Sequence, residues 1–243
     1  MISQNSNKLI CSLHQKKFRT KYGKFIIEGA RAIDYALNNN GDFSIIVYTR
    51  AFLNKNPKII EKIKPFNSSL INEKELKRIS PSTSPSGILG IANNIQYSDF
   101  NNTENFIFLD KVSDPGNMGT IIRTAAWFGV FQIALSEGCI DPFNPKVVRG
   151  AMGAHFSLKW IGEKSILDFR DYKLIGAVPK SKSITTPYSL NDKWGLIMGS
   201  EAHGISRDNY SHLSDTIAIP KIGKGESLNI GVAMGILLHQ LTK

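Results

Sequence analysis

The sequence predicts an α/β protein built from two domains. Short apolar runs typical of strands alternate with helix-like segments along the whole chain, which is the pattern of α/β folds. A polar stretch at residues 96–105 separates a basic front half from a nearly neutral back half, and we interpret it as an interdomain linker. We therefore expect a small α/β sandwich at residues 1–97, a linker at residues 98–105 and a second α/β domain at residues 106–243.

The front half alternates helices with short strands. Glycine, proline and asparagine punctuate most of the junctions between them. Expected helices cover residues 8–21, 31–37, 57–64 and 73–79, and expected strands cover residues 24–28, 43–48, 66–71 and 87–92.

The back half begins with a run, Phe106–Asp110, that is apolar at nearly every position. A strand of that kind is covered on both faces, as in a parallel sheet. A turn at residues 114–117 precedes an expected helix at 118–128, and a loop at 141–145 precedes another at 146–152. Further strands are expected at residues 131–135, 157–161, 173–178, 195–199 and 215–219.

The charge of the chain is positive and unevenly distributed. The formal net charge is +10, and residues 1–100 carry 15 Lys and Arg against 7 Asp and Glu. Residues 8–24 hold six basic side chains and no acid. This distribution favours a polyanion such as nucleic acid as the partner of the front half, although lysine-rich helices also serve simply as solvated surfaces.

Cysteine and histidine usage argues against a disulfide framework and a metal site. The chain has two cysteines, Cys11 and Cys139, and five scattered histidines without ligand spacing. Its first residues contain no apolar segment of the kind found in signal peptides, and its apolar runs are too short to span a bilayer. We therefore expect a cytoplasmic protein without a metal.

The last thirty residues combine a strand, a glycine-rich loop and an apolar helix. Gly223 and Gly225 let a ligand approach the backbone of the loop, and Ser227 is the expected N-cap of the helix. A strand, loop and helix N-terminus suit an anion or a cofactor, but an ordinary buried helix after a glycine turn fits equally well. The spacing matches neither GxGxxG nor GxxxxGK[ST], which excludes a nucleotide-binding oxidoreductase and a P-loop protein.

Two charged residues stand out in apolar or glycine-rich surroundings. Arg123 is the charged residue of the apolar helix at 118–128, where it is either functional or an arginine that extends from a half-buried helix to solvent. Glu201 follows a buried strand among glycines, where it is either a site residue or a cap for the next helix.

Three segments in the back half, DPGNMGTIIRTA, GSEAHGIS and IPKIGKGESLNIGVA, occur in that order. Together they closely resemble the three motifs of the SpoU (TrmH-like) RNA 2′-O-ribose methyltransferases of the SPOUT superfamily. The resemblance covers residues 106–243. It implies an α/β fold with a parallel sheet and a C-terminal trefoil knot, S-adenosylmethionine (AdoMet) as methyl donor, no metal, and a homodimer formed through the catalytic domain.

The front half is similar, through KFIIEG and SPSGILG, to the substrate-binding domain of many RNA ribose methyltransferases, which resembles ribosomal protein L30e. The similarity implies contacts to RNA phosphates, which give affinity rather than sequence choice. The residues expected to make them are Lys16, Lys17, Arg19, Lys21 and Arg31, together with Lys146 and Arg149 of the second domain.

The resemblance also implies roles in the reaction. Arg123 holds the target phosphate and ribose and assists removal of the 2′-hydroxyl proton, since a guanidinium keeps its own proton. Asn117 orients Arg123 or the substrate, Glu201 fixes the arginine or its loop, and Ser227 and Asn229 hold the third motif and the ribose. The residues expected to contact the cofactor are Ile197, Gly199, Gly204, Ile219 and Leu228.

The function implied is AdoMet-dependent 2′-O-methylation of ribosomal RNA of the 23S type. Two alternatives remain open from the sequence. One is a tRNA ribose methyltransferase, and the other is a non-catalytic RNA-binding or ribosome-assembly factor on the same fold.

Overall fold

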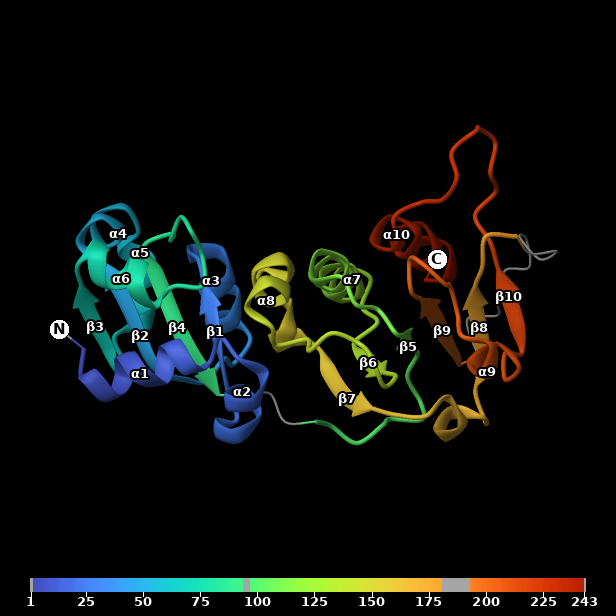
Figure 1. The fold of residues 1–243 in the computed structure, drawn as a ribbon, viewed down its shortest axis with the longest axis horizontal. Coiled ribbons are helices and arrows are strands. Elements are labelled where there is room, and N and C mark those ends of the chain that lie inside the picture. The colour runs from blue at the N-terminus through green and yellow to red at the C-terminus, as the bar shows by residue number, and fades with distance from the viewer. Residues whose placement is uncertain (1, 94–96, 181–192, 243) are drawn as a thin grey trace. The chain divides into compact units, whose positions relative to one another are not determined.

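The computed structural model describes residues 2–93, 97–180 and 193–242 (Figure 1). By their contacts the residues form two compact units, one of residues 1–95 with 141–156 and one of residues 96–140 with 157–243. The division differs from the single cut expected from the sequence, because the segment 141–156 packs with the front half. The functional domain boundaries stay a prediction.

The first unit is a four-stranded mixed sheet with helices around it (Figure 1). Its strand order is β1-β4-β2-β3, in which β4 runs antiparallel to both neighbours and β2 and β3 are parallel. The strands are β1 (Lys24–Glu28), β2 (Phe43–Thr49), β3 (Ser68–Ile71) and β4 (Ile88–Asn93). The helices are α1 (Gln4–Ser12), α2 (Lys16–Tyr22), α3 (Ala30–Asn38), α4 (Arg50–Lys55), α5 (Pro57–Ile63), α6 (Glu73–Ile79) and α8 (Pro145–Ala151).

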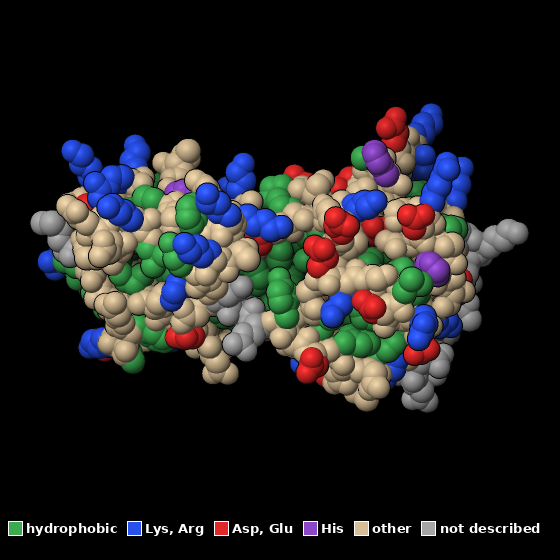
Figure 2. Space-filling view, turned by 60° about the horizontal axis from the view of Figure 1, so that its bottom comes forward, with side chains coloured by type: hydrophobic (Ala, Val, Ile, Leu, Met, Phe, Trp, Pro, Cys, Tyr) green, Lys and Arg blue, Asp and Glu red, His purple; other side chains and the backbone are tan. Residues whose placement is uncertain are grey.

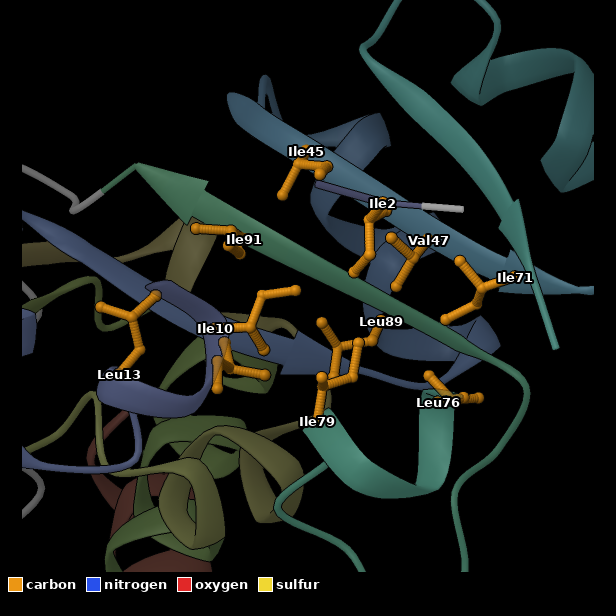
Figure 3. Packing of buried hydrophobic residues seen from close by; sticks show 11 residues of the cluster. Ile2, Ile10, Leu13, Ile45, Val47, Ile71, Leu76, Ile79, Leu89 and Ile91 are labelled. Atoms are coloured by element: carbon orange, nitrogen blue, oxygen red, sulfur yellow. The ribbon is translucent and has the colours of Figure 1, made fainter. Parts of the chain in front are cut away.

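A continuous aliphatic cluster fills the space between this sheet and the helices α1 and α6 (Figure 3). Ile10 and Leu13 from the α1 region meet Leu89 and Ile91 of β4, and all four side chains are buried. Burial of this apolar surface is the main favourable term in the folding of the unit.

The predicted helix at residues 8–21 is wrong, because two helices occupy this region. The first, α1, ends at Ser12 with Leu13 as its C-cap, and Gln15 has extended backbone before α2 begins. The break turns Leu13 into the core, and the buried Arg19 of α2 donates hydrogen bonds to the carbonyl oxygens of Leu13 and His14 at 2.9 and 3.0 Å. Arg19, near the middle of the basic segment at residues 8–24, therefore anchors this segment to the first unit.

The segment 141–156 is held in the first unit by aromatic packing. The rings of Phe143 and Phe156 lie 5.0 and 5.9 Å from the ring of Phe25 in β1. Gly153 has a φ of +91°, and a Cβ there would lie 2.6 Å from the carbonyl oxygen of Ala32 in α3. The close approach requires glycine, since a side chain would push the segment off α3.

The second unit contains a six-stranded, wholly parallel sheet of order β10-β8-β9-β5-β6-β7. The strands are β5 (Phe106–Asp110), β6 (Gln132–Leu135), β7 (Lys159–Glu163), β8 (Lys173–Ala177), β9 (Trp194–Gly199) and β10 (Asp215–Ile217). Its α-helices are α7 (Pro115–Trp127), α9 (Arg207–Tyr210) and α10 (Ile230–Leu241). The chain also has two 3-10 turns, η1 (Ala154–Ser157), which lies mostly in the first unit, and η2 (Ile166–Phe169), which lies in the second.

The predicted parallel α/β architecture is confirmed, and its central strand β5 is buried at all five positions. Phe106 and Phe108 pack with Phe169 of η2, with ring centroids 4.5 and 6.0 Å apart. Because every strand runs the same way, the carboxyl ends of all six strands lie along one edge of the sheet. The trefoil knot implied by the resemblance stays a prediction.

The helices α7 and α10 pack against each other closely. A Cβ at Gly231 would lie 2.6 Å from Cγ2 of Thr120, so the small residue lets the two helix backbones approach. The predicted turn at residues 114–117 is instead the N-cap and first turn of α7, where Asp114 accepts the N–H of Asn117 at 2.8 Å. The predicted N-cap Ser227 is also wrong, because Asn229 caps α10.

Among the residues that the structure describes, no helix has both the length and the apolar character needed to cross a bilayer.

Protonation of His155 should destabilise the first unit. The imidazole is fully buried, its Nε2–H donates to the carbonyl of Pro142 at 2.8 Å, and burial lowers its pKa from 6.5 to about 4. The unfolded chain therefore binds more protons between these two values, and stability should fall as the pH falls through this window, by on the order of 3 kcal/mol.

Urea unfolding at several pH values checks this expectation. His155→Gln keeps a donor near Pro142 and should lose the part of the pH dependence that belongs to the imidazole. An unchanged pH dependence in the variant would show that other groups cause it.

Candidate active site

A cavity of about 500 Å³ lies at the carboxyl edge of the parallel sheet. Its walls are the residues that follow β8, β9 and β10, together with the start of α10. In open parallel sheets the carboxyl ends of the strands are the usual place for a ligand. The loop between β10 and α10 closes one side of this cavity and is seen in Figure 1 as the red extension beside α10.

Glycines make the loop after β9 compact. Ser200 and Gly204 exchange backbone hydrogen bonds of 3.1 and 2.8 Å across a tight turn, in which Gly204 has a φ of +67°. A Cβ on Gly199 would lie 2.1 Å from backbone atoms of Gly204 and Ile205, so any side chain there forces the turn open. The turn presents Glu201 to solvent at the rim of the cavity.

A chain of side-chain hydrogen bonds connects three loops that are far apart in the sequence. Asn117 of α7 donates through Nδ2 to Oε1 of Glu201 and accepts through Oδ1 from Nδ2 of Asn229, the latter at 2.6 Å. Asn229 Oδ1 in turn accepts the N–H groups of Gly231 and Val232 at 2.9 and 3.4 Å. The amide of Asn117 is thus both donor and acceptor, and it fixes the loop after β9 against the start of α10.

Asp110 is a buried acid beside the candidate site that the sequence prediction did not single out, and it does not line the cavity. It is fully buried at the end of β5, paired in register with Gly199, and its Oδ2 accepts the N–H of Ser206 at 2.7 Å. Its Oδ1 has no hydrogen-bond partner within the described part of the chain. The sequence feature that could have identified it is the single acid at the carboxyl end of the apolar run FIFLD.

Arg123 does not line the cavity at the sheet edge. It is exposed on α7 and lines a second, open groove of about 760 Å³ between α7 and α10. Trp127, which is 85% exposed, lies along the same groove with Val232 and Ile236 of α10. The two hollows use opposite sides of α10, since Ile230, Ala233 and Leu237 line the first and Gly231, Val232 and Gly235 line the second.

The predicted cofactor residues divide into two groups. Gly199, Ile219 and Leu228 line the cavity, as do the predicted catalytic residues Glu201, Ser227 and Asn229. Ile197 does not line it, because its side chain is fully buried in the core of the second unit. Gly204 also lies outside the lining, and its positive φ serves the tight turn instead. The roles assigned to the lining residues stay predictions.

Of the predicted RNA-contacting residues, Arg19 is placed differently from the rest. It is 5% exposed, and its Nε and Nη2 donate to Oδ2 of Asp141 at 2.8 and 2.5 Å. A guanidinium buried in this way holds the segment 141–156 and is not available to phosphates, because Asp141 occupies it. The other predicted cations, Lys16, Lys17, Lys21, Arg31, Lys146 and Arg149, are exposed in the first unit.

Lys and Arg side chains are spread over the surface of the first unit with few acids among them, as Figure 2 shows for one face. This surface is suited to a polyanion. Within the described ranges no group of three or more His, Cys, Asp or Glu side chains is arranged to hold a metal ion.

A parallel α/β sheet with a loop-lined, glycine-bounded cavity at its carboxyl edge is typical of enzymes that bind a cofactor or a nucleotide. A family model described as the SpoU rRNA Methylase family matches residues 104–239, and one described as the MRM3-like substrate binding domain matches residues 5–90. The chain belongs to the SpoU rRNA methylase family, which confirms the resemblance seen in the three motifs.

Relatives and solved structures agree with this assignment. The chain is 26% identical to the 23S rRNA (guanosine(2553)-2′-O)-methyltransferase RlmP of Bacillus subtilis, over 94% of this chain and 92% of that protein. It is similar to the AdoMet-bound rRNA methyltransferase of Sinorhizobium meliloti, with 27% identity, a TM-score of 0.81 and coverage of 99% and 96% of the two chains. A TrmH-family protein from Porphyromonas gingivalis gives 28% identity, a TM-score of 0.84 and coverage of 99% and 98%.

Gly199→Ala should weaken ligand binding in the cavity while leaving the protein folded. The added methyl group clashes with the backbone of Gly204 and Ile205, so the loop that carries Glu201 must move. Gly223→Ala is the matched control, because Gly223 also lines the cavity but a Cβ there meets no atom within 4 Å.

Titration calorimetry with AdoMet measures the effect. We expect at least about a tenfold loss of affinity for Gly199→Ala, since a change of 1.4 kcal/mol is a factor of ten, and little change for Gly223→Ala. Equal affinity in the two variants would contradict the role of the turn.

Proposed function

We propose that the protein transfers a methyl group from AdoMet to a ribose 2′-hydroxyl of ribosomal RNA, of the 23S type. The observation that carries the proposal is that the loops of the second and third motifs line one cavity, and that Asn117 of the first motif is hydrogen-bonded to a residue of each, Glu201 and Asn229. The RlmP relative supports the substrate class, because its alignment covers nearly the whole of both chains. We place the reaction in the cytoplasm.

The cavity fits AdoMet in size and chemistry. A volume of about 500 Å³ lies within the range of ligand pockets, and its glycines leave room for direct contact with the backbone. Ile219, Leu228 and Leu237 provide apolar contacts. The lining has two acids, Glu201 and Glu226, against one cation, Lys221, and this excess of negative charge suits a ligand that carries a sulfonium. When bound, AdoMet supplies an activated methyl group on a sulfonium.

The side chains of the protein then act by orienting the RNA phosphate and ribose. Arg123 cannot serve as a base at ordinary pH, because its guanidinium stays protonated. It is suited to hold an RNA phosphate with two parallel hydrogen bonds, and we assign that phosphate the role of accepting the 2′-hydroxyl proton. Ser227 and Asn229 of the third motif are assigned to the ribose, where correct alignment accounts for much of the rate.

A homodimer through α7 and α10 completes the proposal. The groove between these helices exposes Trp127, Val232 and Ile236, at 85%, 51% and 36%. Apolar side chains gathered in this way mark an association surface, and a two-fold dimer would bury the same face of each copy. The dimer would contain two copies of Arg123, and in this proposal the Arg123 that holds the RNA at one cavity comes from either protomer.

Methyl transfer from labelled AdoMet to ribosomal RNA and to unmodified tRNA tests the function. We expect label in ribosomal RNA at a single ribose, mapped by resistance of that linkage to alkaline cleavage. Arg123→Ala should lower the rate by about 10²- to 10⁴-fold, the usual contribution of an assisted proton transfer. Lys164→Ala, which removes an exposed cation elsewhere in the second unit, is the control and should keep full activity.

The other outcomes decide between the alternatives. Label in tRNA alone would replace ribosomal RNA by tRNA as the substrate. AdoMet binding without transfer to naked RNA would require a ribosomal particle as substrate, whereas absence of AdoMet binding would favour a non-catalytic RNA-binding factor.

Trp127→Glu should convert the dimer to monomer. A buried tryptophan contributes a large apolar area to an interface, and a carboxylate there would be desolvated without a partner. Leu167→Glu is the matched control, because Leu167 is 50% exposed on η2, away from the groove. Sedimentation equilibrium should show a dimer for the control, and a dimer that persists in Trp127→Glu would place the interface elsewhere.

A further inference from the structure

The helix α2 carries an aromatic pair within a segment of the sequence that has no acidic residues. Residues 1–27 contain six Lys and Arg side chains and no Asp or Glu. Within α2 the rings of Phe18 and Tyr22 stack with centroids 6.1 Å apart and an interplanar angle of 11°. The ring of Tyr22 belongs to a residue that is 42% exposed, so part of this aromatic surface faces solvent.

Lysines flank both rings of this pair. The Nζ of Lys17 lies 4.8 Å from the centroid of Phe18, and the Nζ of Lys21 lies 5.6 Å from the centroid of Tyr22. Both lysines are exposed. Positive charge next to an exposed ring is the combination with which proteins hold unpaired nucleotides, since the lysine meets the phosphate and the ring meets the base.

The buried Arg19 determines which way α2 faces. Its guanidinium is bound to Asp141 and to the carbonyl groups of Leu13 and His14, so this side of the helix points into the unit. Residues two positions away on a helix lie on nearly the opposite side, which turns Lys17 and Lys21 outward. Gly23 ends the helix in the left-handed conformation, so the orientation is defined at the C-terminus as well.

An aromatic pair four residues apart also occurs in helices merely for stability. That explanation does not account for the exposure of Tyr22 or for the lysine beside each ring. If the pair only stabilised the helix, burying the ring of Tyr22 more deeply would increase that stability. A surface that binds bases instead requires this ring to remain accessible.

We propose that Phe18 and Tyr22 form a stacking platform for an unpaired base of the RNA substrate, with Lys17 and Lys21 contacting the adjoining phosphates. The inference rests on the proposed function, to which it adds that the first unit binds a single-stranded loop, bulge or end and not only a duplex surface. Sequence-tolerant binding follows, because every base offers a π-face to the platform. The match of residues 5–90 to a substrate binding domain is consistent with RNA at this helix.

Fluorescence anisotropy with the full-length protein tests the platform. The probes are a short oligouridylate, the same strand with abasic sugars and a duplex RNA of equal length. Tyr22→Leu should weaken binding of the oligouridylate by about 5- to 100-fold, the range expected for loss of one stacked base. It should leave binding of the abasic strand and of the duplex unchanged.

Three further variants show whether the effect belongs to the ring. Tyr22→Phe keeps the π-face and should bind like the unaltered protein, while Tyr210→Leu removes a tyrosine that is 51% exposed on α9 and should have no effect. Lys21→Ala should weaken all three RNAs and reduce the salt dependence of binding by about 0.7 in slope for the single strands. Thermal unfolding of each variant identifies any loss that comes from misfolding.

The outcomes separate this inference from the proposed function. Equal affinity of Tyr22→Leu and the unaltered protein for the oligouridylate would overturn the platform, as would an equal loss for the abasic strand, even if methyl transfer to RNA is intact. Absence of AdoMet binding by the unaltered protein would overturn the proposed function while leaving the platform intact, whereas failure of the unaltered protein to bind the oligouridylate would overturn the platform.

Discussion

The amide of Asn117 is the interaction on which the candidate active site depends. Its two hydrogen bonds connect the first turn of α7, the loop after β9 and the cap of α10. These segments lie 84 and 112 residues away from Asn117 along the chain, so local structure cannot bring them together. A neutral amide suits this position because it donates and accepts at once, whereas a carboxylate would only accept.

The parallel sheet makes this connection possible. Two of the three residues of the amide network follow neighbouring strands, since β5 leads into α7 with Asn117 and β9 leads to Glu201, and all five residues of β5 pair with β9. Asp110 at the end of β5 adds a further link to the loop after β9, by accepting the N–H of Ser206. The cavity is therefore bounded by loops whose bases are fixed by sheet hydrogen bonds, while the loop of residues 220–229 remains exposed along its whole length.

The sequence was sufficient to predict the α/β class and the buried strand β5, because both depend on short-range pattern, and the resemblance to a known family identified the three motif segments. It could not predict the burial of Arg19, because its partner Asp141 is 122 residues away and the two meet only after folding. The same limit applies to the segment 141–156, whose aromatic residues pack on β1. Ser227 and Asn229 are both good caps by type, and the hydrogen bonds of Asn229 to Asn117 and to α10 decide between them.

Two of the predicted site residues, Arg123 and Ile197, do not line the cavity. Arg123 belongs to the first motif but lies on the groove with Trp127, on the other side of α10 from the cavity. Ile197 belongs to the strand that leads to the cavity but is part of the core. A motif identifies residues that are close in sequence, whereas the helical and strand periodicities send neighbours to different faces.

The central claim is that Asn117 couples Glu201 to Asn229. A mutant cycle on AdoMet affinity, measured by calorimetry for Glu201→Ala, Asn229→Ala and the double variant, tests it most directly. The account predicts a coupling of about 0.5–3 kcal/mol between two side chains that bond to the same amide, and its loss when the cycle is repeated with Asn117→Ala. Additive effects in the original cycle, or an unchanged coupling without the Asn117 amide, would contradict the account.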